Sequence, residues 1–270
     1  YVVLALLPNY LEREGSSLVF MVDDLIQKSK NSESGFYLNN IEELAKKLTE
    51  LVDSIQNGKL VDIGVYEGAS SRVMINQSTD NNNIIYAIDP VHPIFNSNHP
   101  NYNYIKDDSV YIGETWANGQ VDLVFFDSVH AKEQVLCELY YWWDLIKENG
   151  YAIFHDTSWD GYIHKPGHSC AGKKTGNSGM GYDAYGGINW ETPDKAVEDF
   201  FKIKLNTNEK DIENNKILKI YEDDYITVET NYSLLGMTFV TKKKSFNYKN
   251  NISNWSEIFD KRKILLSFFK

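Results

Sequence analysis

Cysteine and basic residues are both scarce in this sequence. Its 270 residues include two cysteines, Cys137 and Cys170, so a disulfide framework is excluded and a reducing compartment is favoured. Lys and Arg number 27 against 38 Asp and Glu, which gives a formal net charge of -11 at pH 7. We therefore expect no nucleic-acid partner, whereas a small cationic ligand would not be repelled.

Long hydrophobic runs are also missing. No apolar stretch reaches the roughly 18 residues that a membrane-spanning helix needs, and the early run from Val2 to Leu7 stops at Pro8. This run lacks a basic leader and a small-residue cleavage site, so we expect no signal peptide, no membrane partner and a cytoplasmic location. The chain begins with Tyr1, which leaves open whether it is a domain of a longer polypeptide.

The remaining composition is that of a globular protein, with 42% hydrophobic residues and enough length to bury a core. We predict an N-terminal helical and loop segment over residues 1–38, with a helix near Leu18 to Ile26. An amphipathic helix should follow, because apolar residues recur at spacings of three and four. These residues are Ile41, Leu44, Leu48, Leu51 and Ile55.

Short apolar strands then alternate with helices. The predicted strands are residues 60–63, 84–88, 102–105, 121–126 and 151–154, and the predicted helices start at Ser70 and cover 132–147. Strands without polar alternation are buried on both faces, which is typical of a parallel sheet covered by helices. The fold class expected is therefore α/β, with a doubly wound, mostly parallel sheet.

The C-terminal third departs from this alternation. Residues 157–190 are rich in Gly, Tyr, Trp and His, and a loop of this length is usually functional, so we predict an active-site lid. A helix should begin at Thr192-Pro193, and residues 217–228 and 234–241 should pair as antiparallel strands. The predicted main domain is 39–245, followed by a helical tail over 246–270.

Four successive strands end in acidic residues. They are Asp62, followed by Gly64, then Asp89, Asp127 and His155-Asp156. Ligands of such sheets bind beyond the carboxyl ends of the strands. Like charges gathered at one edge repel each other, so we expect a site that binds cations or hydroxyl groups there.

The turn after the first of these strands carries Gly64 and Gly68, four residues apart. It lacks the close glycine pair of a dinucleotide-binding turn, which suits a ligand with an amine and no phosphate. Asp89 is placed to accept hydrogen bonds from both hydroxyls of a ribose. Two plainer interpretations stay open: a tight strand-to-helix connection, and a helix cap by Asp89 before Pro90.

These motifs resemble those of class I S-adenosylmethionine (SAM)-dependent methyltransferases, which have a Rossmann-like fold. The segments Phe126-Asp-Ser-Val-His130 and Phe154-His-Asp-Thr157 resemble more specifically the metal-dependent sugar O-methyltransferases of macrolide biosynthesis, of the macrocin and mycinamicin type, and the related cephalosporin hydroxylase-like group. So do Glu138 to Ile146 and Thr192 to Phe201. The resemblance covers roughly residues 36 to 242. It implies SAM as cofactor, with cofactor-binding residues Asp62, Gly64, Gly68, Ser70, Asp89, Asp108 and Ser109.

The same resemblance implies that Asp127 and Asp156 bind a divalent cation, Mg²⁺ or Mn²⁺, and that His130 is the general base. The family commonly has Glu where this chain has His155. Imidazole is a softer ligand than carboxylate and would shift the preference from magnesium towards manganese or zinc, unless His155 points elsewhere. A sugar hydroxyl is a weak acid, so a cation and a base would both assist its methylation.

Other interpretations remain at this stage. The acceptor could be a sugar, a glycan or a phenolic or catechol small molecule, and the chain could be a non-catalytic cofactor-binding module. A nicotinamide oxidoreductase is disfavoured by the missing glycine pair. His164, His168 and Cys170 could bind zinc, although a substrate-covering loop explains them more simply. A homo-oligomer is compatible with the sequence.

Overall fold

The computed structural model describes residues 4–5, 35–36, 39–91, 95, 97–157, 191–205, 217–231 and 236–267. The predicted helix at 18–26 lies outside these residues, as does the predicted lid apart from Thr157. The chain divides into two compact units, Tyr1–Leu48 and Thr49–Lys270. The domain boundaries inferred from the sequence stay predictions.

Among the described residues of the N-terminal unit, β1 (Leu4–Ala5) pairs in parallel with β2 (Gly35–Phe36). Helix α2 (Asn39–Ser54) follows and continues into the second unit. This helix matches the stripe of apolar residues from Ile41 to Ile55. Within the described residues, no helix combines the length and the apolar character required to cross a membrane.

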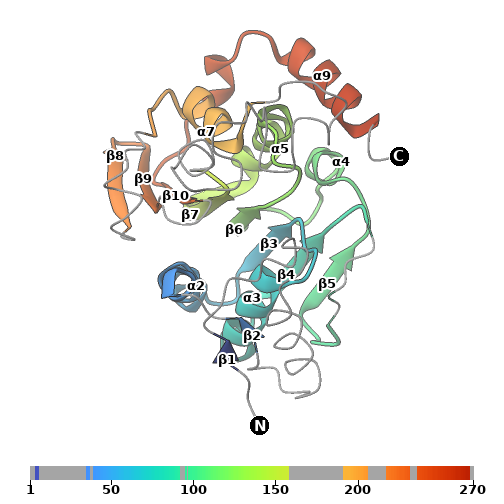
Figure 1. The fold of residues 1–270 in the computed structure, drawn as a ribbon, viewed down its shortest axis with the longest axis vertical. Helices are drawn as coiled ribbons and strands as arrows, with labels where there is room; N and C mark the ends of the chain where they lie inside the picture. Colours follow the sequence, from blue (N-terminus) through green and yellow to red (C-terminus); the bar gives the residue numbers. More distant parts are fainter. Residues whose placement is uncertain are drawn as a thin grey trace. The chain divides into compact units, whose positions relative to one another are not determined.

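The second unit is built on an eight-stranded sheet in the order β5-β4-β3-β6-β7-β10-β9-β8 (Figure 1). Its parallel strands are β3 (Lys59–Ile63), β4 (Ile84–Ile88), β5 (Tyr102–Ile105), β6 (Val121–Phe126) and β7 (Ile146–His155). Its antiparallel strands are β8 (Leu218–Glu222), β9 (Ile226–Asn231) and β10 (Met237–Lys242). The predicted α/β class, with a mostly parallel sheet and antiparallel strands at its C-terminal side, is confirmed.

Helices cover both faces of this sheet. Helix α3 (Ala69–Asn81) lies on one face, and α5 (Lys132–Leu145) lies on the other with α4 (Ser109–Glu114), α7 (Pro193–Phe201) and α9 (Trp255–Ser267) packed against it (Figure 1). A short 3-10 helix, η2 (Tyr248–Asn251), contacts α7. The main hydrophobic core includes Trp142 and Trp143 of α5, which are fully buried, as expected of residues that pack on the sheet.

Two predicted boundaries were wrong. The helix predicted to run to residue 147 ends at Leu145, and β7 begins at Ile146, ahead of the Asn-Gly pair expected to end the helix. The side chain of Lys242 on β10 donates hydrogen bonds to the carbonyls of Trp143 and Ile146, at 3.0 and 2.7 Å. These bonds satisfy carbonyls at the helix end and come from a residue far away in the sequence.

The strand predicted over 217–228 is two strands, β8 and β9. Asp223 breaks it, because its carboxylate oxygen Oδ1 accepts hydrogen bonds from the backbone N–H groups of Tyr225 and Ile226, both at 2.8 Å. This is the turn-forming use of an Asp side chain, and it outweighs the alternating pattern of the flanking residues. The antiparallel pairing of the second half of that segment with 237–242 is confirmed.

Candidate active site

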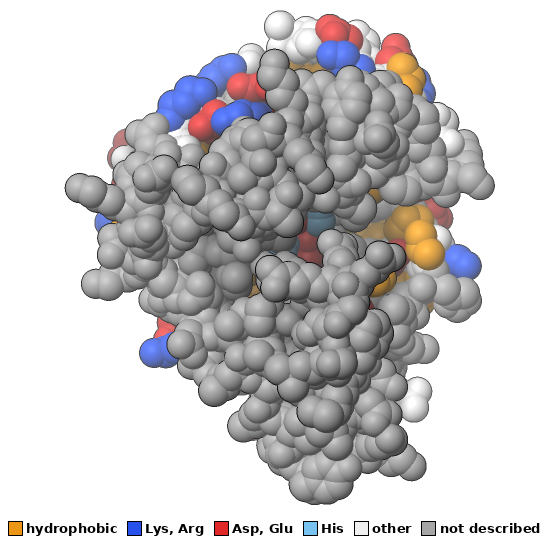
Figure 2. Space-filling view, in the orientation of Figure 1, with side chains coloured by type: hydrophobic (Ala, Val, Ile, Leu, Met, Phe, Trp, Pro, Cys, Tyr) orange, Lys and Arg blue, Asp and Glu red, His pale blue; other side chains and the backbone are white. Residues whose placement is uncertain are grey.

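The carboxyl ends of β4, β3, β6 and β7 meet at one edge of the sheet, where the strand order reverses between β3 and β6. Open α/β sheets bind ligands at such a switch point. Asp89, Gly64, Asp127 and Asp156 follow these four strands directly. Figure 2 shows histidine and acidic side chains near the centre of its view.

The turn between β3 and α3 requires glycine at two places. Gly64 has φ +87°, and a Cβ there would lie 2.0 Å from the backbone oxygen of Asp127. Gly68 has φ +75°, and its Cβ would lie 2.2 Å from the ring of Phe95. The absence of side chains therefore lets the β3 turn pass directly over the end of β6.

The predicted cofactor-binding residues Asp62 and Ser70 bind each other. Asp62 is fully buried, and its carboxylate accepts hydrogen bonds from the hydroxyls of Ser70, at 2.8 Å, and Ser71. Burial raises the pKa of Asp62 to about 7 despite these hydrogen bonds. Its visible role is to fix the start of α3 against β3.

Asp89 lies beside the same turn. Its Oδ2 accepts a hydrogen bond from the backbone N–H of Tyr66, between the two glycines, at 3.2 Å, and its Oδ1 accepts one from Val91 N–H at 2.9 Å. The second bond closes a local turn across Pro90 and is not the helix cap of the plainer interpretation, because residues 89–91 are not helical. The first bond places the carboxylate against the glycine turn. Tyr104 Oη also donates to the carbonyl of Asp89, at 2.9 Å, and joins the end of β5 to this edge.

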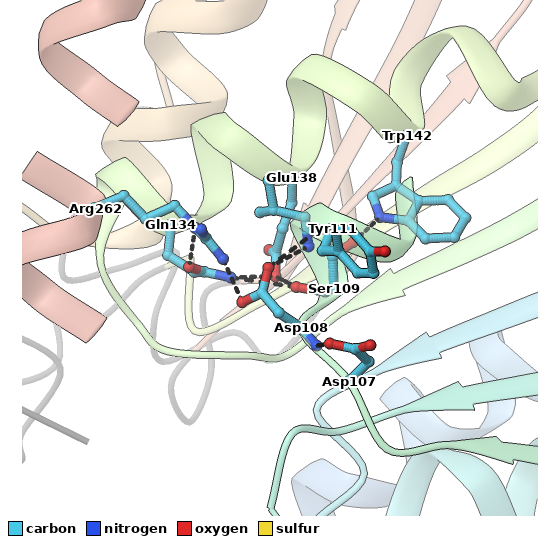
Figure 3. A network of polar contacts seen from close by, with 9 residues as sticks. Asp107, Asp108, Ser109, Tyr111, Gln134, Glu138, Trp142 and Arg262 are labelled. Atoms are coloured by element: carbon cyan, nitrogen blue, oxygen red, sulfur yellow. Dashed lines mark hydrogen bonds and ion pairs between the residues drawn. The ribbon is translucent and has the colours of Figure 1, made fainter. Parts of the chain in front are cut away.

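Asp108 and Ser109 follow β5 and start α4. Asp108 Oδ1 caps this helix by accepting from the N–H groups of Val110 and Tyr111, at 3.1 and 3.0 Å. The buried hydroxyl of Ser109 donates to Glu138 Oε1 at 2.6 Å. Both side chains thus belong to one polar network (Figure 3), with Ser109 buried and Asp108 half-buried, and their predicted part in cofactor binding stays a prediction.

Four side chains from the ends of β6 and β7 form one cluster, Asp127, His130, His155 and Asp156, with a ligand atom of each within 4.8 Å of the others. The imidazole of His130 lies between the two acids, with Nε2 3.2 Å from Asp127 Oδ1 and Nδ1 2.9 Å from Asp156 Oδ2. His155 Nδ1 lies 3.2 Å from Asp127 Oδ1 and 2.9 Å from Asp156 Oδ1. The four residues predicted to bind metal or act as base are therefore brought together.

The charges in this cluster reinforce one another. Burial opposes protonation of His130, but the Asp156 and Asp127 carboxylates outweigh it and raise the pKa of His130 to about 10. The same carboxylates raise the pKa of His155 well above its ordinary value against the effect of burial. Burial would raise the pKa of both acids, yet the two histidines hold each of them below its usual range.

The cluster fits a divalent cation. Asp156 is fully buried, and neither of its carboxylate oxygens makes a hydrogen bond of normal geometry, nor does Nδ1 of His155. Asp156 also has φ +57°, an uncommon conformation for Asp that is often kept at functional sites. The two carboxylates of Asp127 and Asp156 and the imidazole of His155 are a donor set suited to Mn²⁺ or another first-row metal.

Two residues of the network in Figure 3, Gln134 of α5 and Arg262 of α9, were missed from the sequence, and Glu138 of α5 was named only as the start of a family-like segment. All three are buried. Glu138 and Arg262 lie in register with the apolar stripes of their helices, three or four residues from buried neighbours. A charged residue on a buried helix face was the available signal.

Comparison with known proteins identifies part of this chain. Residues 61–157, which include the glycine turn and the acid-histidine cluster, match the protein family described as a methyltransferase domain. This match supports the resemblance seen in the motifs and confirms a methyltransferase domain over these residues. No curated protein matches the chain.

Similar solved structures include PaMTH1, a methyltransferase of Podospora anserina bound to S-adenosylhomocysteine (SAH), at 13% identity, covering 85% of this chain and 97% of that one with a TM-score of 0.47. TomG, an O-methyltransferase of Streptomyces achromogenes involved in tomaymycin synthesis, is 11% identical over 87% of this chain and 94% of its own, with a TM-score of 0.44. MycE, a methyltransferase of the mycinamycin pathway solved with Mg, SAH and mycinamycin VI, is 15% identical over 87% of this chain and 57% of its own, with a TM-score of 0.43.

Proposed function

From the methyltransferase domain over residues 61–157, we propose that this chain is a SAM-dependent O-methyltransferase that is assisted by a divalent cation and methylates a sugar hydroxyl. The observation that carries the proposal is the cluster of Asp127, His130, His155 and Asp156 beside the Asp89 turn. In this proposal Asp89, after β4, binds the ribose of SAM. The cluster at the ends of β6 and β7 provides the base and the metal ligands for the acceptor.

Methyl transfer from a sulfonium is a displacement that needs a nucleophilic oxygen about 3 Å from the methyl carbon. In this proposal Asp89 holds the ribose hydroxyls of SAM, and the β3 turn approaches the cofactor closely because Gly64 and Gly68 have no side chains. His130, part-buried at the end of β6, accepts the proton of the acceptor hydroxyl.

A divalent cation would be held by Asp127, His155 and Asp156, and it would make the acceptor hydroxyl more acidic. Without a cation, a pKa of about 10 keeps His130 protonated at neutral pH and unable to act as base. Positive charge next to the two carboxylates lowers that pKa again. The proposed cation and the proposed base are therefore consistent with one another.

The sugar acceptor rests on the resemblance of segments 126–130 and 154–157 to sugar O-methyltransferases. A phenolic or catechol acceptor is the alternative. A cytoplasmic location, a glycan or small-molecule partner and a homo-oligomeric state remain predictions.

The test is binding first and turnover second. Calorimetry with SAH should show binding, and Asp89→Ala should weaken it by about 1.5–3 kcal/mol, the usual worth of charge-assisted hydrogen bonds. The matched control is Asp80→Asn, an exposed carboxylate on α3, which should leave SAH affinity unchanged. Failure of the wild-type protein to bind SAH would overturn the methyltransferase proposal.

Turnover is then measured with isotopically labelled SAM on two acceptor panels, nucleotide sugars and glycans in one and catechols and phenols in the other. Methylation in the first panel, lost with a strong chelator and restored by Mn²⁺ or Mg²⁺, is the expected result. Methylation confined to the second panel would replace the sugar with a phenolic acceptor. Full turnover in excess chelator would remove the cation from the proposal.

A further inference from the structure

The C-terminal helix α9 lies outside residues 61–157, which match the methyltransferase domain, yet its buried face contacts two segments of the candidate site. Ile258, Arg262 and Leu265 are its buried residues. Leu265 is fully buried and packs with Val129 and Ala131, the neighbours of His130 on both sides. Arg262, one helical turn earlier, reaches the start of α4 (Figure 3).

Arg262 is 8% exposed and uses two donor groups of its guanidinium. Nη2 forms an ion pair with Asp108 Oδ2, and Nε donates to Gln134 Oε1 at 2.8 Å. Gln134 in turn donates to Glu138 Oε1 at 2.8 Å. Because the guanidinium of Arg262 is largely shielded from water and bonded to both Asp108 and Gln134, it fixes the orientation of these two side chains.

The partner that matters is Asp108. Its other oxygen, Oδ1, caps α4, so the one carboxylate is fixed at both ends, by Arg262 and by the helix N-terminus. The turn that carries it follows β5, whose end is joined to Asp89 by the hydrogen bond from Asp89 N–H to the Ile105 carbonyl, at 3.2 Å. A change in the orientation of Asp108 should therefore shift the end of β5 and, through this hydrogen bond, the position of Asp89 at the proposed ribose site.

We propose that Arg262 is a positioning residue of the cofactor site, which holds Asp108 and the start of α4 in place from the C-terminal helix. The inference rests on the proposed function, because it assigns SAM to the edge formed by Asp89 and Asp108. Arg262 acts through Asp108 and takes no part in the methyl transfer itself.

The experiment compares SAH affinity and steady-state kinetics of Arg262→Met with those of two neighbouring changes on the same helix. Lys261→Met and Lys263→Met each remove one positive charge from an exposed pair, with Glu257 and Asp260 respectively. Arg262→Met should raise the SAH dissociation constant and the KM for SAM about tenfold and leave kcat nearly unchanged. Both lysine variants should match the wild type, and Arg262→Lys should recover part of the affinity.

A double-mutant cycle separates positioning from a general loss of stability. If Arg262 acts through Asp108, Arg262→Met should add little to the loss of SAH affinity caused by Asp108→Asn. Equal SAH affinity of the wild type and Arg262→Met, or fully additive losses in the double variant, would overturn the inference. A kcat of Arg262→Met that falls by as much as its kcat/KM would overturn the inference as well. A wild type that binds no SAH would instead overturn the proposed function, so the two failures are distinguishable.

Discussion

Asp62 and Asp89 stand at the ends of neighbouring strands, yet their carboxylates face different partners. Asp62 is enclosed by the serines of α3, whereas Asp89 accepts from backbone groups at the glycine turn. The sequence predicted both as cofactor-binding residues, because the position of a residue at a strand end does not show whether its side chain is buried. Their different surroundings make separate predictions for each residue.

The stability of the protein should depend on pH through Asp62. Its pKa in the folded state, about 7, lies above its ordinary value of 3.8, so the folded state binds more protons between these values. The contribution of Asp62 is therefore most favourable below pH 4 and is lost as the pH rises towards 7, by up to about 1.4 kcal/mol for each pH unit. Asp62→Asn avoids this cost, so the stability of the variant relative to the wild type should increase between pH 5 and pH 7.5.

Urea unfolding at both pH values measures this difference. Asp80→Asn, which removes an exposed carboxylate from α3, serves as the control and should show no comparable trend. A constant difference between Asp62→Asn and the wild type across this range would show that Asp62 is not protonated on folding.

His130 and His155 should not be equivalent. His130→Ala should reduce turnover by about 10²–10⁴, the usual worth of a general base, with SAH affinity retained. His155→Ala should raise the metal concentration needed for half-maximal activity, and His155→Glu should remain active and favour Mg²⁺. Metal titrations of the three variants test this, and rescue of His130→Ala but not His155→Ala by excess metal would reverse the two assignments.

A pH profile tests the proposed base independently. His130 must be neutral to accept a proton, so the rate should fall below its pKa. The neighbouring carboxylates raise that pKa against the effect of burial, and a cation lowers it. The midpoint of the rate profile should therefore move to lower pH as the metal concentration rises, and a midpoint independent of metal would contradict this arrangement.

At the scale of elements, much of the sheet could be predicted because its strands are continuous apolar runs ended by Gly, Asp or Pro. The ends of α5 and of β8 could not. The end of α5 is fixed by Lys242, almost 100 residues later in the sequence. A lysine at the end of a strand would be expected on the surface from its local sequence alone. Long-range partners of this kind are invisible to local periodicity.

The same limit explains which parts of the site were predictable. The residues at strand ends were found because the order of a parallel sheet brings such ends together. Arg262 was not, because nothing in its own segment shows that α9 folds back onto α4. The side-chain partners of Asp62 and Ser109 were likewise hidden, since burial depends on elements distant in sequence.

The turn between β3 and α3 should tolerate no side chain at Gly64. Both Gly64 and Gly119 have positive φ, so replacing either with Ala should cost about 1–2 kcal/mol from backbone strain. At Gly119 the nearest atom, Lys59 Nζ, lies 3.6 Å from the added Cβ, whereas at Gly64 the Asp127 backbone oxygen lies at 2.0 Å. Gly64→Ala should therefore destabilise the protein by roughly 1–3 kcal/mol more than Gly119→Ala.

Urea denaturation of the two variants gives this comparison directly. Gly64→Ala should also lower the affinity for SAH, because the backbone at Asp127 must move, and Gly119→Ala should not. Equal destabilisation by both substitutions would mean that the contact with Asp127 is easily relieved.

At the scale of the whole molecule, the cluster joins two neighbouring strands of the central sheet, so a bound cation should stabilise the entire fold. A ligand at 100 times its dissociation constant adds about 2.7 kcal/mol to the free energy of unfolding. Mn²⁺ should thus raise the Tm of the wild type and leave that of Asp127→Asn and Asp156→Asn unchanged. Asp80→Asn should respond like the wild type, and a uniform response of all four proteins would place the cation elsewhere.

The position of β10 beside β7 has a consequence for how the protein is made. Residues 237–242 of β10 pair with residues 150–155 of β7, with Met237 opposite His155. The strand that borders β7 on this side is therefore synthesised some 80 residues after it. Closing so long a loop costs chain entropy before the pairing returns any stability, which slows folding. While the ribosome is still extending the chain, β7 has an open edge and the end that carries His155 and Asp156 is unsupported on that side. Folding of this centre is therefore expected after synthesis of β10 and not during emergence of the strands that carry its residues.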